Sequence, residues 1–343
     1  MKILFLSHSF FPAVGGIETV SEFLATSFSE AGHEVRLLTW TMGGDDAHFI
    51  FNVLRSPSLA ECLQSHVWAD ILFENNPSLR LSWPNIFFKR PYVVALHTWL
   101  SRASGTSGWQ DNLKRRYLRG ASKVIACSDA LREQSWPPAI VIGNSYKQEL
   151  FRIIPEVVRT NDFVFLGRLV SDKGAELAIL AFHQFITEAF NQQDRRLTII
   201  GDGPERERLT ELVSNLQLEN NVFFRGVLSG EQLVECLNQN SYLLVPSLWE
   251  EPFGIVVLEG MACGCLPIVS DGGGLPEAVG QAGIIVKRGS IGDLAGGLKN
   301  ITENRDLEMK LRALAKEHLK AHSPELVSSR YLSVLKIAFD SVN

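Results

Sequence analysis

The feature that most constrains the fold is the alternation of short apolar runs with longer amphipathic stretches. The apolar runs are Ile3–Leu6, Val35–Leu38, Ile71–Phe73, Tyr92–Leu96, Val124–Cys127, Ile140–Ile142, Phe163–Leu166, Leu197–Ile200, Val222–Phe224, Tyr242–Val245, Leu266–Val269 and Gly283–Val286. Uninterrupted runs of this kind are typical of parallel strands that are covered on both faces. Stretches such as Glu18–Ala31, Ala175–Phe190 and Glu205–Leu216 have helical periodicity. The alternation therefore predicts a doubly wound α/β fold.

The number of predicted strands indicates two domains, because an ordinary sheet has about six strands. The irregular, polar-rich segment Gly143–Asn161 separates the two series of runs. We expect an N-terminal Rossmann-like domain at residues 1–150, a C-terminal one at residues 151–323, and a final helix at residues 324–343 that packs back on the first domain. Two such halves facing across a cleft would bring both sets of strand carboxyl ends to it, where open α/β sheets bind ligands.

Composition excludes several other classes of protein. Of the 343 residues, 45% are hydrophobic and 21% are charged, which is typical of globular chains and not of disordered ones. The net charge of -5 argues against a dedicated nucleic-acid binder. The five cysteines are odd in number and lie mostly in apolar runs, so we expect reduced thiols and neither a disulfide framework nor a metal site. No apolar stretch has the length of a signal peptide or a membrane span, which predicts a cytoplasmic protein.

Two glycines, Gly15 and Gly16, follow the first predicted strand and precede a helix. Glycines at this position let free backbone N–H groups approach a phosphate, although a two-glycine turn taken alone is more often a simple tight turn. The pattern lacks the third glycine of the dinucleotide fingerprint, and the second strand ends in Thr39-Trp40 without an acidic residue. A nicotinamide-dependent dehydrogenase is therefore disfavoured.

The first predicted strand of the second domain is followed by two cations, Arg168 and Lys173. Two fixed cations at a strand end can neutralise a leaving diphosphate without a metal, and a solvated basic loop is the alternative. The next strand is followed by a turn that contains Gly203. The strand after that ends in Arg225-Gly226, where backbone groups could meet the edge of a nucleobase.

The segment Pro246–Ala262 carries the strongest signal. A helix should start near Gly254 and end near Gly264, with N-terminal N–H groups available for a phosphate or sugar oxygen. Glu259 lies more than one turn inside this apolar helix, where a carboxylate needs partners such as a ribose diol. Glu251, eight residues earlier, could reach the other end of the same ligand. The alternative is a carboxylate that complements the helix dipole together with one buried structural glutamate.

In this order and spacing the motifs resemble the GT-B glycosyltransferases of family 4, which are retaining transferases that use nucleotide sugars. The resemblance covers nearly the whole chain. The residues that carry it are Gly15-Gly16, His97, Asn144, Arg168, Lys173, Gly201–Pro204, the E-x7-E pair Glu251 and Glu259, and Ser270–Glu277. It implies a GT-B architecture of two Rossmann-like domains facing across a cleft.

The resemblance also implies roles for particular residues. Arg168 and Lys173 would hold the donor diphosphate, Glu251 the hydroxyls of the transferred sugar, and Glu259 the ribose. His97 would face the reacting sugar, although a histidine at a strand end can also be a core residue. Four residues would thus carry the catalysis, namely His97, Arg168, Lys173 and Glu251. The remaining donor contacts would come from Gly16, Gly203, Arg225, Gly226, Phe253, Gly254, Ile255 and Val256.

The expected activity is that of a retaining hexosyltransferase in polysaccharide biosynthesis. By family frequency the donor would be UDP-glucose, and the acceptor a hydroxyl of a glycan or a lipid-linked glycan. No Asp-x-Asp motif is present, so neither a metal nor another cofactor is expected. Two alternatives stay open, a nucleotide-sugar 2-epimerase of similar fold and a glycan-binding protein without catalysis.

A basic cluster with neighbouring aromatic residues lies in the first domain. Its members are Arg102, Lys114, Arg115, Arg116 and Arg119, with Trp99 and Trp109 nearby. The cluster is compatible with an anionic acceptor at a membrane surface, and hence with peripheral contact at the inner face of the membrane. A solvated basic helix face is the alternative.

Overall fold

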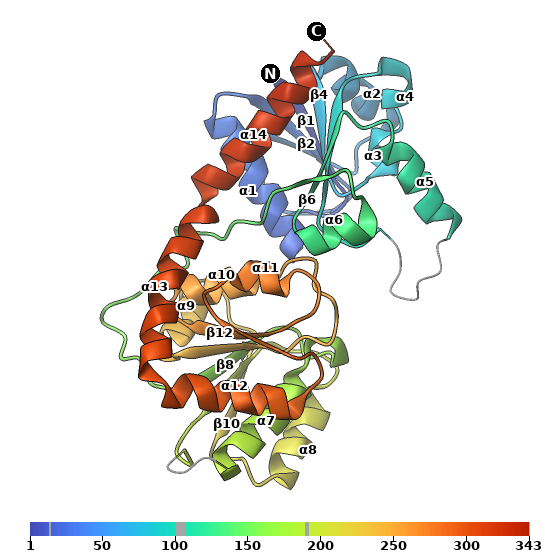
Figure 1. Ribbon diagram of the computed structural model, residues 1–343. Helices are drawn as coiled ribbons and strands as arrows, with labels where there is room; N and C mark the ends of the chain where they lie inside the picture. Colours follow the sequence, from blue (N-terminus) through green and yellow to red (C-terminus); the bar gives the residue numbers. More distant parts are fainter. Residues whose placement is uncertain (14, 101–107, 189–191, 343) are drawn as a thin grey trace. The chain divides into compact units, whose positions relative to one another are not determined.

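The computed structural model describes residues 1–13, 15–100, 108–188 and 192–342 (Figure 1). It divides into two compact units. Unit 1 comprises Met1–Ser145 and Pro324–Asn343, and unit 2 comprises Tyr146–Ser323. The chain leaves unit 1 five residues before the expected end of the first domain, within the polar segment that the sequence marks as irregular. Arg102 of the basic cluster lies outside the described residues.

Unit 1 contains a seven-stranded parallel sheet with the strand order β3-β2-β1-β4-β5-β6-β7. The strands are β1 (Lys2–Ser7), β2 (Glu34–Thr39), β3 (Asn52–Arg55), β4 (Ile71–Asn75), β5 (Tyr92–Leu96), β6 (Lys123–Ala126) and β7 (Ile140–Val141). The sequence predicts six of these strands. It misses β3, an edge strand with the sequence Asn-Val-Leu-Arg, because half-exposed edge residues form no continuous apolar run.

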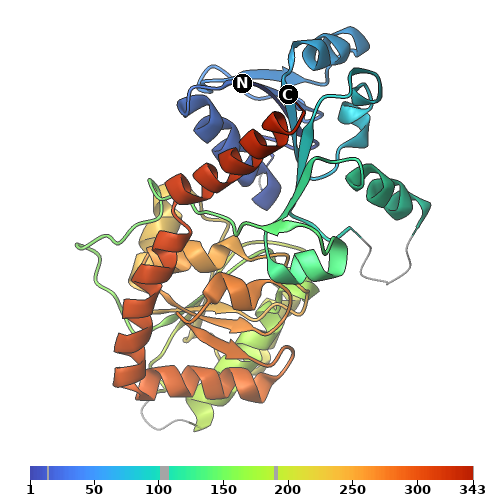
Figure 2. The same ribbon diagram turned by 45° about the horizontal axis from the view of Figure 1, so that its top comes forward.

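The helices of unit 1 lie on the two faces of this sheet. They are α1 (Gly16–Glu30), α2 (Leu59–Trp68), α3 (Leu79–Ser82), α4 (Asn85–Phe88), α5 (Trp109–Leu118), α6 (Asp129–Ser135) and α14 (Pro324–Asp340). The C-terminal helix α14 packs against α1 and across β4 and β5, far from it in sequence (Figure 2). Its buried Tyr331 contacts the ring of Phe73 in β4. Burial of the apolar side of α14 holds this end of the chain on unit 1.

Unit 2 contains a six-stranded parallel sheet with the order β10-β9-β8-β11-β12-β13. Its strands are β8 (Phe163–Leu166), β9 (Leu197–Ile200), β10 (Val222–Gly226), β11 (Tyr242–Val245), β12 (Leu266–Ser270) and β13 (Ile284–Val286). Its helices are the 3₁₀ turn η1 (Ser171–Lys173), α7 (Ala175–Glu188), α8 (Arg206–Asn215), α9 (Gly230–Gln239), α10 (Ile255–Ala262), α11 (Leu275–Val279), α12 (Ile291–Glu303) and α13 (Arg305–Ala321).

The core of unit 2 forms where helices cover the sheet. Helices α7, α8 and α12 lie on one face, while α9 and α10 lie on the other (Figure 1). On the first face, Phe182 and Phe185 of α7 pack against Phe163 in β8, with ring centroids 5.8 and 5.5 Å from it. Because both faces are covered, the central strands are apolar throughout, as the sequence predicts.

In both units every strand pair is parallel, so the carboxyl ends of the strands meet at one edge of each sheet. The order of each sheet reverses direction beside its first strand, β1 in unit 1 and β8 in unit 2. Ligands of open α/β sheets bind outside the carboxyl ends at such a reversal. A ligand site is therefore expected in the loops that follow these strands.

Candidate functional site

The loops after β8 and β9 are hydrogen bonded to each other. The N–H of Leu169 donates to the carbonyl of Asp202 at 2.9 Å, and the N–H of Glu205 donates to the carbonyl of Leu169 at 3.1 Å. Gly201 has a φ of +133°, and a Cβ there would lie 1.9 Å from the carbonyl oxygen of Gly167. Only glycine permits this approach. Two predicted site residues, Arg168 and Gly203, are thereby brought onto adjoining loops.

Lys173 and Glu251 come from different loops of unit 2 and form an ion pair. Lys173 Nζ lies 2.5 Å from Glu251 Oε1, and the Ser247 hydroxyl donates to the same oxygen at 2.8 Å. The two side chains are 22% and 14% exposed, so the pair is partly shielded yet accessible. The loop of Glu251 is tied to that of Lys173 because the N–H groups of Leu248 and Trp249 donate to the carbonyl of Asp172.

Arg168 is exposed at the end of β8. Its guanidinium forms no hydrogen bond or ion pair with another residue in the described part of the chain. A guanidinium presents five N–H donors in a planar fork that suits phosphate oxygens. An accessible cation without a carboxylate partner in this loop is suited to bind an anion.

Helix α10 begins where the sequence predicts a helix start. Gly254 is its N-cap residue, with a φ of +107° that favours glycine. The first N–H groups of an α-helix have no acceptor within the helix, so those of Ile255 and Val256 are available to a ligand oxygen. Phe253, just before the cap, is buried and packs against the ring of His322.

Glu259 lies inside α10 and is half-buried. Its apolar surroundings remove enough water to raise its pKa to about 7, and the nearby Lys147 opposes part of this shift. The carboxyl thus changes charge near neutral pH. A partly accessible carboxyl in such surroundings is suited to accept hydrogen bonds from the hydroxyls of a ligand.

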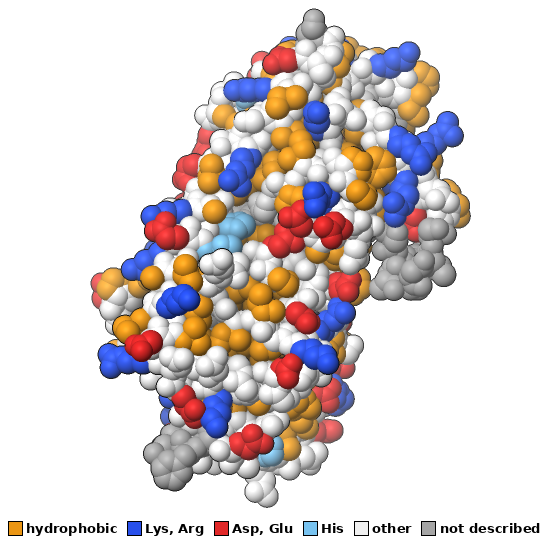
Figure 3. All heavy atoms as spheres, viewed as in Figure 1, with side chains coloured by type: hydrophobic (Ala, Val, Ile, Leu, Met, Phe, Trp, Pro, Cys, Tyr) orange, Lys and Arg blue, Asp and Glu red, His pale blue; other side chains and the backbone are white. Residues whose placement is uncertain are grey.

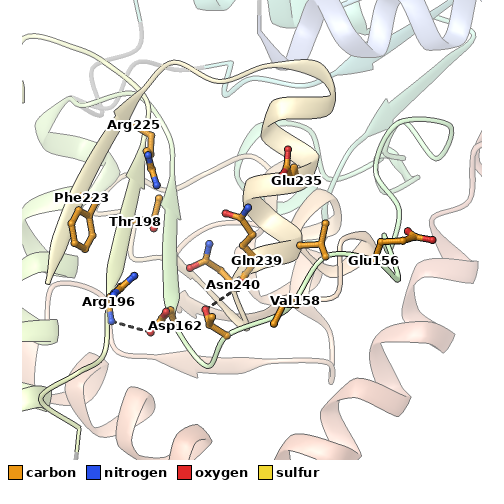
Figure 4. Close-up of a pocket in the computed structure, with 12 residues that line it drawn as sticks. Glu156, Val158, Asp162, Arg196, Thr198, Phe223, Arg225, Glu235, Gln239 and Asn240 are labelled. Carbon is orange, nitrogen blue, oxygen red and sulfur yellow. Dashed lines mark hydrogen bonds between the residues drawn. The ribbon is translucent and has the colours of Figure 1, made fainter.

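Arg225 and Gly226 end β10, and the carbonyl of Gly226 accepts a hydrogen bond from the N–H of Gly201 at 2.8 Å. The backbone of this turn therefore lies beside the loop of Gly203. The Arg225 side chain lines a groove of about 500 Å³ between the edge of the sheet and α9 (Figure 4). The backbone and the side chain of this residue thus face different surroundings.

In unit 1, Gly16 is the first residue of α1, and Gly15 is its N-cap residue. The turn before the helix is tied to its first turn, since the Ser9 hydroxyl donates to Glu18 Oε1 at 2.5 Å. Gly16 thus lies at a helix N-terminus, as the sequence predicts.

His97 follows β5 and is 8% exposed. Its backbone N–H donates to Asn76 Oδ1 at 2.8 Å. Burial lowers the pKa of the imidazole to about 4, and the side chain of Asn144 opposes part of this shift. The ring is therefore neutral at pH 7, which suits hydrogen bonding to a sugar oxygen but not charge stabilisation. The same burial is compatible with a core histidine.

Three polar residues at the end of β4, Glu74, Asn75 and Asn76, have structural roles that the sequence alone does not predict. Asn76 holds the backbone of His97, as described above. Asn75 is buried and donates to the Ser21 hydroxyl at 2.6 Å and to the carbonyl of Ile17 at 3.0 Å, both in α1. Their sequence signal is a run of polar residues directly after the apolar strand Ile71–Phe73.

Glu74, the first of the three, is fully buried in unit 1. It accepts hydrogen bonds from the N–H of Ser78 at 2.9 Å and from the hydroxyl of Tyr117 in α5. Burial raises the pKa of Glu74 to about 7 despite these donors. The end of β4 therefore holds α5 through Glu74, α1 through Asn75 and the His97 turn through Asn76.

The surface of unit 1 carries a cluster of exposed apolar side chains around α4, which we call the α4 patch. Its members are Trp83, Ile86 and Phe87, which are 36%, 72% and 70% exposed. Arg80, Lys89 and Arg90 flank the patch in sequence. In Figure 3, Lys and Arg side chains gather over α4 and α5 with apolar side chains between them.

Among the described helices, none has the length and apolar character needed to cross a membrane.

The chain matches two family models and several characterised relatives. Residues 147–318 match the model "Glycosyl transferases group 1", and residues 14–136 match "Glycosyltransferase Family 4". A D-inositol 3-phosphate glycosyltransferase of Acidothermus cellulolyticus is 28% identical over 267 residues, which are 68% of this chain and 57% of that protein. An N-acetyl-alpha-D-glucosaminyl L-malate synthase of Bacillus anthracis is 30% identical over 165 residues, covering 47% of this chain and 42% of that one. The chain thus spans about half the length of these relatives.

Solved structures share the fold over almost the whole chain. The Anabaena protein HepE in complex with UDP and glucose superposes with a TM-score of 0.79 at 22% identity, covering 98% of this chain and 99% of that one. Sucrose-phosphate synthase from Thermosynechococcus elongatus gives a TM-score of 0.79 at 19% identity, with 99% of both chains covered. The two parallel α/β units therefore have the architecture of GT-B structures, and the chain belongs to the group 1 glycosyltransferases.

Proposed function

We propose that this protein is a retaining glycosyltransferase that moves a hexose from a nucleotide sugar to a hydroxyl group. The observation that carries the proposal is the Lys173–Glu251 ion pair, at 2.5 Å, in the same unit as the unpaired Arg168 and the open N-terminus of α10. This set offers cations for a diphosphate and a carboxylate for sugar hydroxyls. It belongs to a chain of the group 1 family.

In the proposed reaction the bond between the anomeric carbon and the diphosphate oxygen breaks, and a bond to the acceptor oxygen forms on the same face of the sugar. The acceptor proton goes to the departing diphosphate. Arg168 and Lys173 stabilise the negative charge that develops on the leaving group, so the reaction needs no metal ion. The N–H groups of Ile255 and Val256 add partial positive charge at the start of α10.

The carboxylates position the donor. Glu251 accepts hydrogen bonds from hydroxyls of the transferred sugar, and Glu259 accepts them from the ribose. The backbone of Gly203, Arg225 and Gly226 contacts the nucleoside. In unit 1, the N-terminus of α1 at Gly16 offers backbone N–H groups suited to a phosphate oxygen, and neutral His97 is suited to hydrogen bond a sugar oxygen. The low pKa of His97 keeps it uncharged at working pH.

The proposed donor is UDP-glucose. Family frequency supports this choice, and so does the HepE structure, one form of which carries UDP-glucose. The proposed acceptor is a glycan or a lipid-linked glycan in polysaccharide biosynthesis, reached at the cytoplasmic side of a membrane. The α4 patch supports peripheral contact with an anionic bilayer, because apolar side chains with flanking cations are suited to insert at a lipid interface.

The test is a donor screen that measures release of product nucleotide, followed by an acceptor array with the best donor. Release from UDP-glucose that increases with an acceptor supports the proposal. Epimerised sugar in the absence of acceptor would favour the 2-epimerase. Glycan binding without nucleotide release from any donor would favour a binding protein without catalysis.

A further inference from the structure

The groove beside β10 has no role in the proposed reaction. It lies in unit 2 between the edge of the sheet, α9 and the segment at residues 156–162 (Figure 4). Its volume of about 500 Å³ falls within the range of small-molecule sites. Of the residues with a proposed donor contact, Arg225 alone lines it, and it does so through its side chain.

One wall of the groove comes from the two outer strands. Arg196 and Thr198 of the β9 segment and Phe223 and Arg225 of β10 line it. Within each strand these are alternate residues, whose side chains project to one face of the sheet. The Arg196 guanidinium lies 5.8 Å from the centroid of the Phe223 ring, which is itself half-buried. This wall presents an aromatic ring with hydrogen-bond donors on either side.

The opposite wall comes from α9. Glu235 and Gln239 are four residues apart and so share one side of the helix. Neither side chain hydrogen bonds another residue in the described ranges, and the same holds for the side chains of Thr198 and Arg225. Donors and acceptors on both walls are therefore available to a ligand (Figure 4).

The charges that line the groove restrict the class of ligand. Two guanidinium groups, Arg196 and Arg225, stand among three carboxylates, Glu156, Asp162 and Glu235. An anion would meet the carboxylates and a cation would meet the guanidinium groups. An apolar molecule would leave the polar walls without partners. A neutral ligand whose hydroxyls both donate and accept, and which offers a flat apolar face to Phe223, satisfies all of these groups.

We propose that this groove binds a segment of a neutral oligosaccharide, as a second carbohydrate site separate from the donor site. This inference rests on the proposed function only for the role of the groove, which would be to hold a glycan acceptor near the donor loops. Binding itself requires no turnover and can be measured alone. Phe223 would stack on a sugar ring, while Arg225, Glu235 and Gln239 would bind its hydroxyls.

The experiment is calorimetric titration of the full chain, both without UDP and saturated with UDP, with maltohexaose, cellohexaose and mannohexaose as probes. We expect saturable millimolar binding of at least one probe. Phe223→Ala should weaken this binding about tenfold, since stacking contributes roughly 1.5 kcal/mol. Phe223→Trp should retain it, because the platform is kept. Met309→Ala, which removes an exposed apolar side chain from α13, should change nothing.

Three results would overturn the inference. They are the absence of binding by all three probes, unchanged affinity in a folded Phe223→Ala variant, and binding that UDP abolishes, which would place the sugar in the donor site. Self-association that Phe223→Ala removes, without glycan binding, would make the groove a contact between copies. Failure to bind UDP would count against the proposed function alone, because the titrations without UDP still decide whether the groove binds a glycan.

Discussion

Lys173 Nζ and Glu251 Oε1 lie 2.5 Å apart, although 77 residues separate the two in the chain. The Ser247 hydroxyl shares the same carboxylate oxygen. Each partner thus holds the other in place before any ligand arrives. Such preorganisation is what a site needs if a cation must meet a diphosphate while a carboxylate meets the sugar attached to it.

Glu251→Gln should lower turnover more than it lowers affinity for UDP. The amide keeps the shape of the side chain but loses the charge that holds Lys173 and accepts sugar hydroxyls. We expect kcat to fall at least about tenfold. The matched control is Glu250→Gln, which removes the neighbouring carboxylate, paired with Arg288 at 3.1 Å. Equal effects of the two changes on kcat would contradict the role assigned to Glu251.

Nucleotide affinity should depend on pH through Glu259, whose pKa is raised to about 7. Ribose hydroxyls that donate to this group favour its ionised form, so affinity for UDP should fall as the pH drops from 8 to 6. In Glu259→Gln that part of the pH dependence should disappear. Calorimetric titration at several pH values measures both. An identical pH profile in the variant would show that Glu259 does not bind the nucleotide.

The same shift has a consequence for stability, with a defined sign. A carboxyl whose pKa is raised on folding favours the protonated folded state. Its penalty is absent below the unfolded value of about 4.5, grows as the pH rises towards the folded value of about 7, and stays constant above it. Glu259→Gln should therefore gain stability relative to the wild type at pH 8 and not at pH 4.5. Denaturant unfolding at the two pH values tests this.

Tyr117→Phe should destabilise the protein more at pH 8 than at pH 6. The hydroxyl of Tyr117 donates to buried Glu74 and opposes the rise in its pKa. Its loss removes a partly buried hydrogen bond and leaves the buried carboxyl of Glu74 without one donor, at a cost of about 1–3 kcal/mol, and it makes ionisation of Glu74 more costly. Tyr92→Phe is the control, because the Tyr92 hydroxyl donates to the backbone carbonyl of Tyr117 at 2.7 Å. Equal pH dependence in both variants would argue against the link to Glu74.

The α4 patch should contribute to binding of anionic vesicles. Ile86→Ser combined with Phe87→Ser removes two side chains that are 72% and 70% exposed, with little effect on the core. Co-sedimentation with phosphatidylglycerol vesicles should weaken at least about tenfold. Met309→Ser, on α13 of unit 2, serves as the control. Binding that is unaffected by the double change would exclude this patch as the contact with lipid.

Much of the fold could be predicted because parallel strands covered on both faces are marked by apolar residues alone. The twelve apolar runs all coincide with strands of the structure, and the helix predicted from Gly254 begins at Ile255. The strand β3 was missed because an edge strand need not be apolar. Arg168 and Lys173 could be singled out because charged residues in the loop after an apolar strand differ from the run before them, and Glu251 because of its spacing from Glu259.

The features that could not be predicted from the sequence depend on contacts between residues far apart in the chain. The end of β4 is an example, since only the tertiary structure shows that Glu74, Asn75 and Asn76 hold α5, α1 and the turn of His97. The groove beside β10 is another. Its walls come from β9, β10 and α9, and the polar residues of these elements form no motif that the sequence alone would single out. The contributions of His97 and Gly16 to a reaction stay predictions, because each is placed in unit 1 by its own contacts alone.

The central claim is that Arg168 and Lys173 stabilise a departing nucleoside diphosphate. The most direct measurement is the release of UDP from UDP-glucose by the wild type, Lys173→Ala and Lys299→Ala, the last of which removes an exposed lysine from α12. We predict release by the wild type, a loss of at least about 100-fold in Lys173→Ala and no change in Lys299→Ala. Undiminished release in Lys173→Ala, or a wild type that neither binds nor releases any nucleoside diphosphate, would contradict the account.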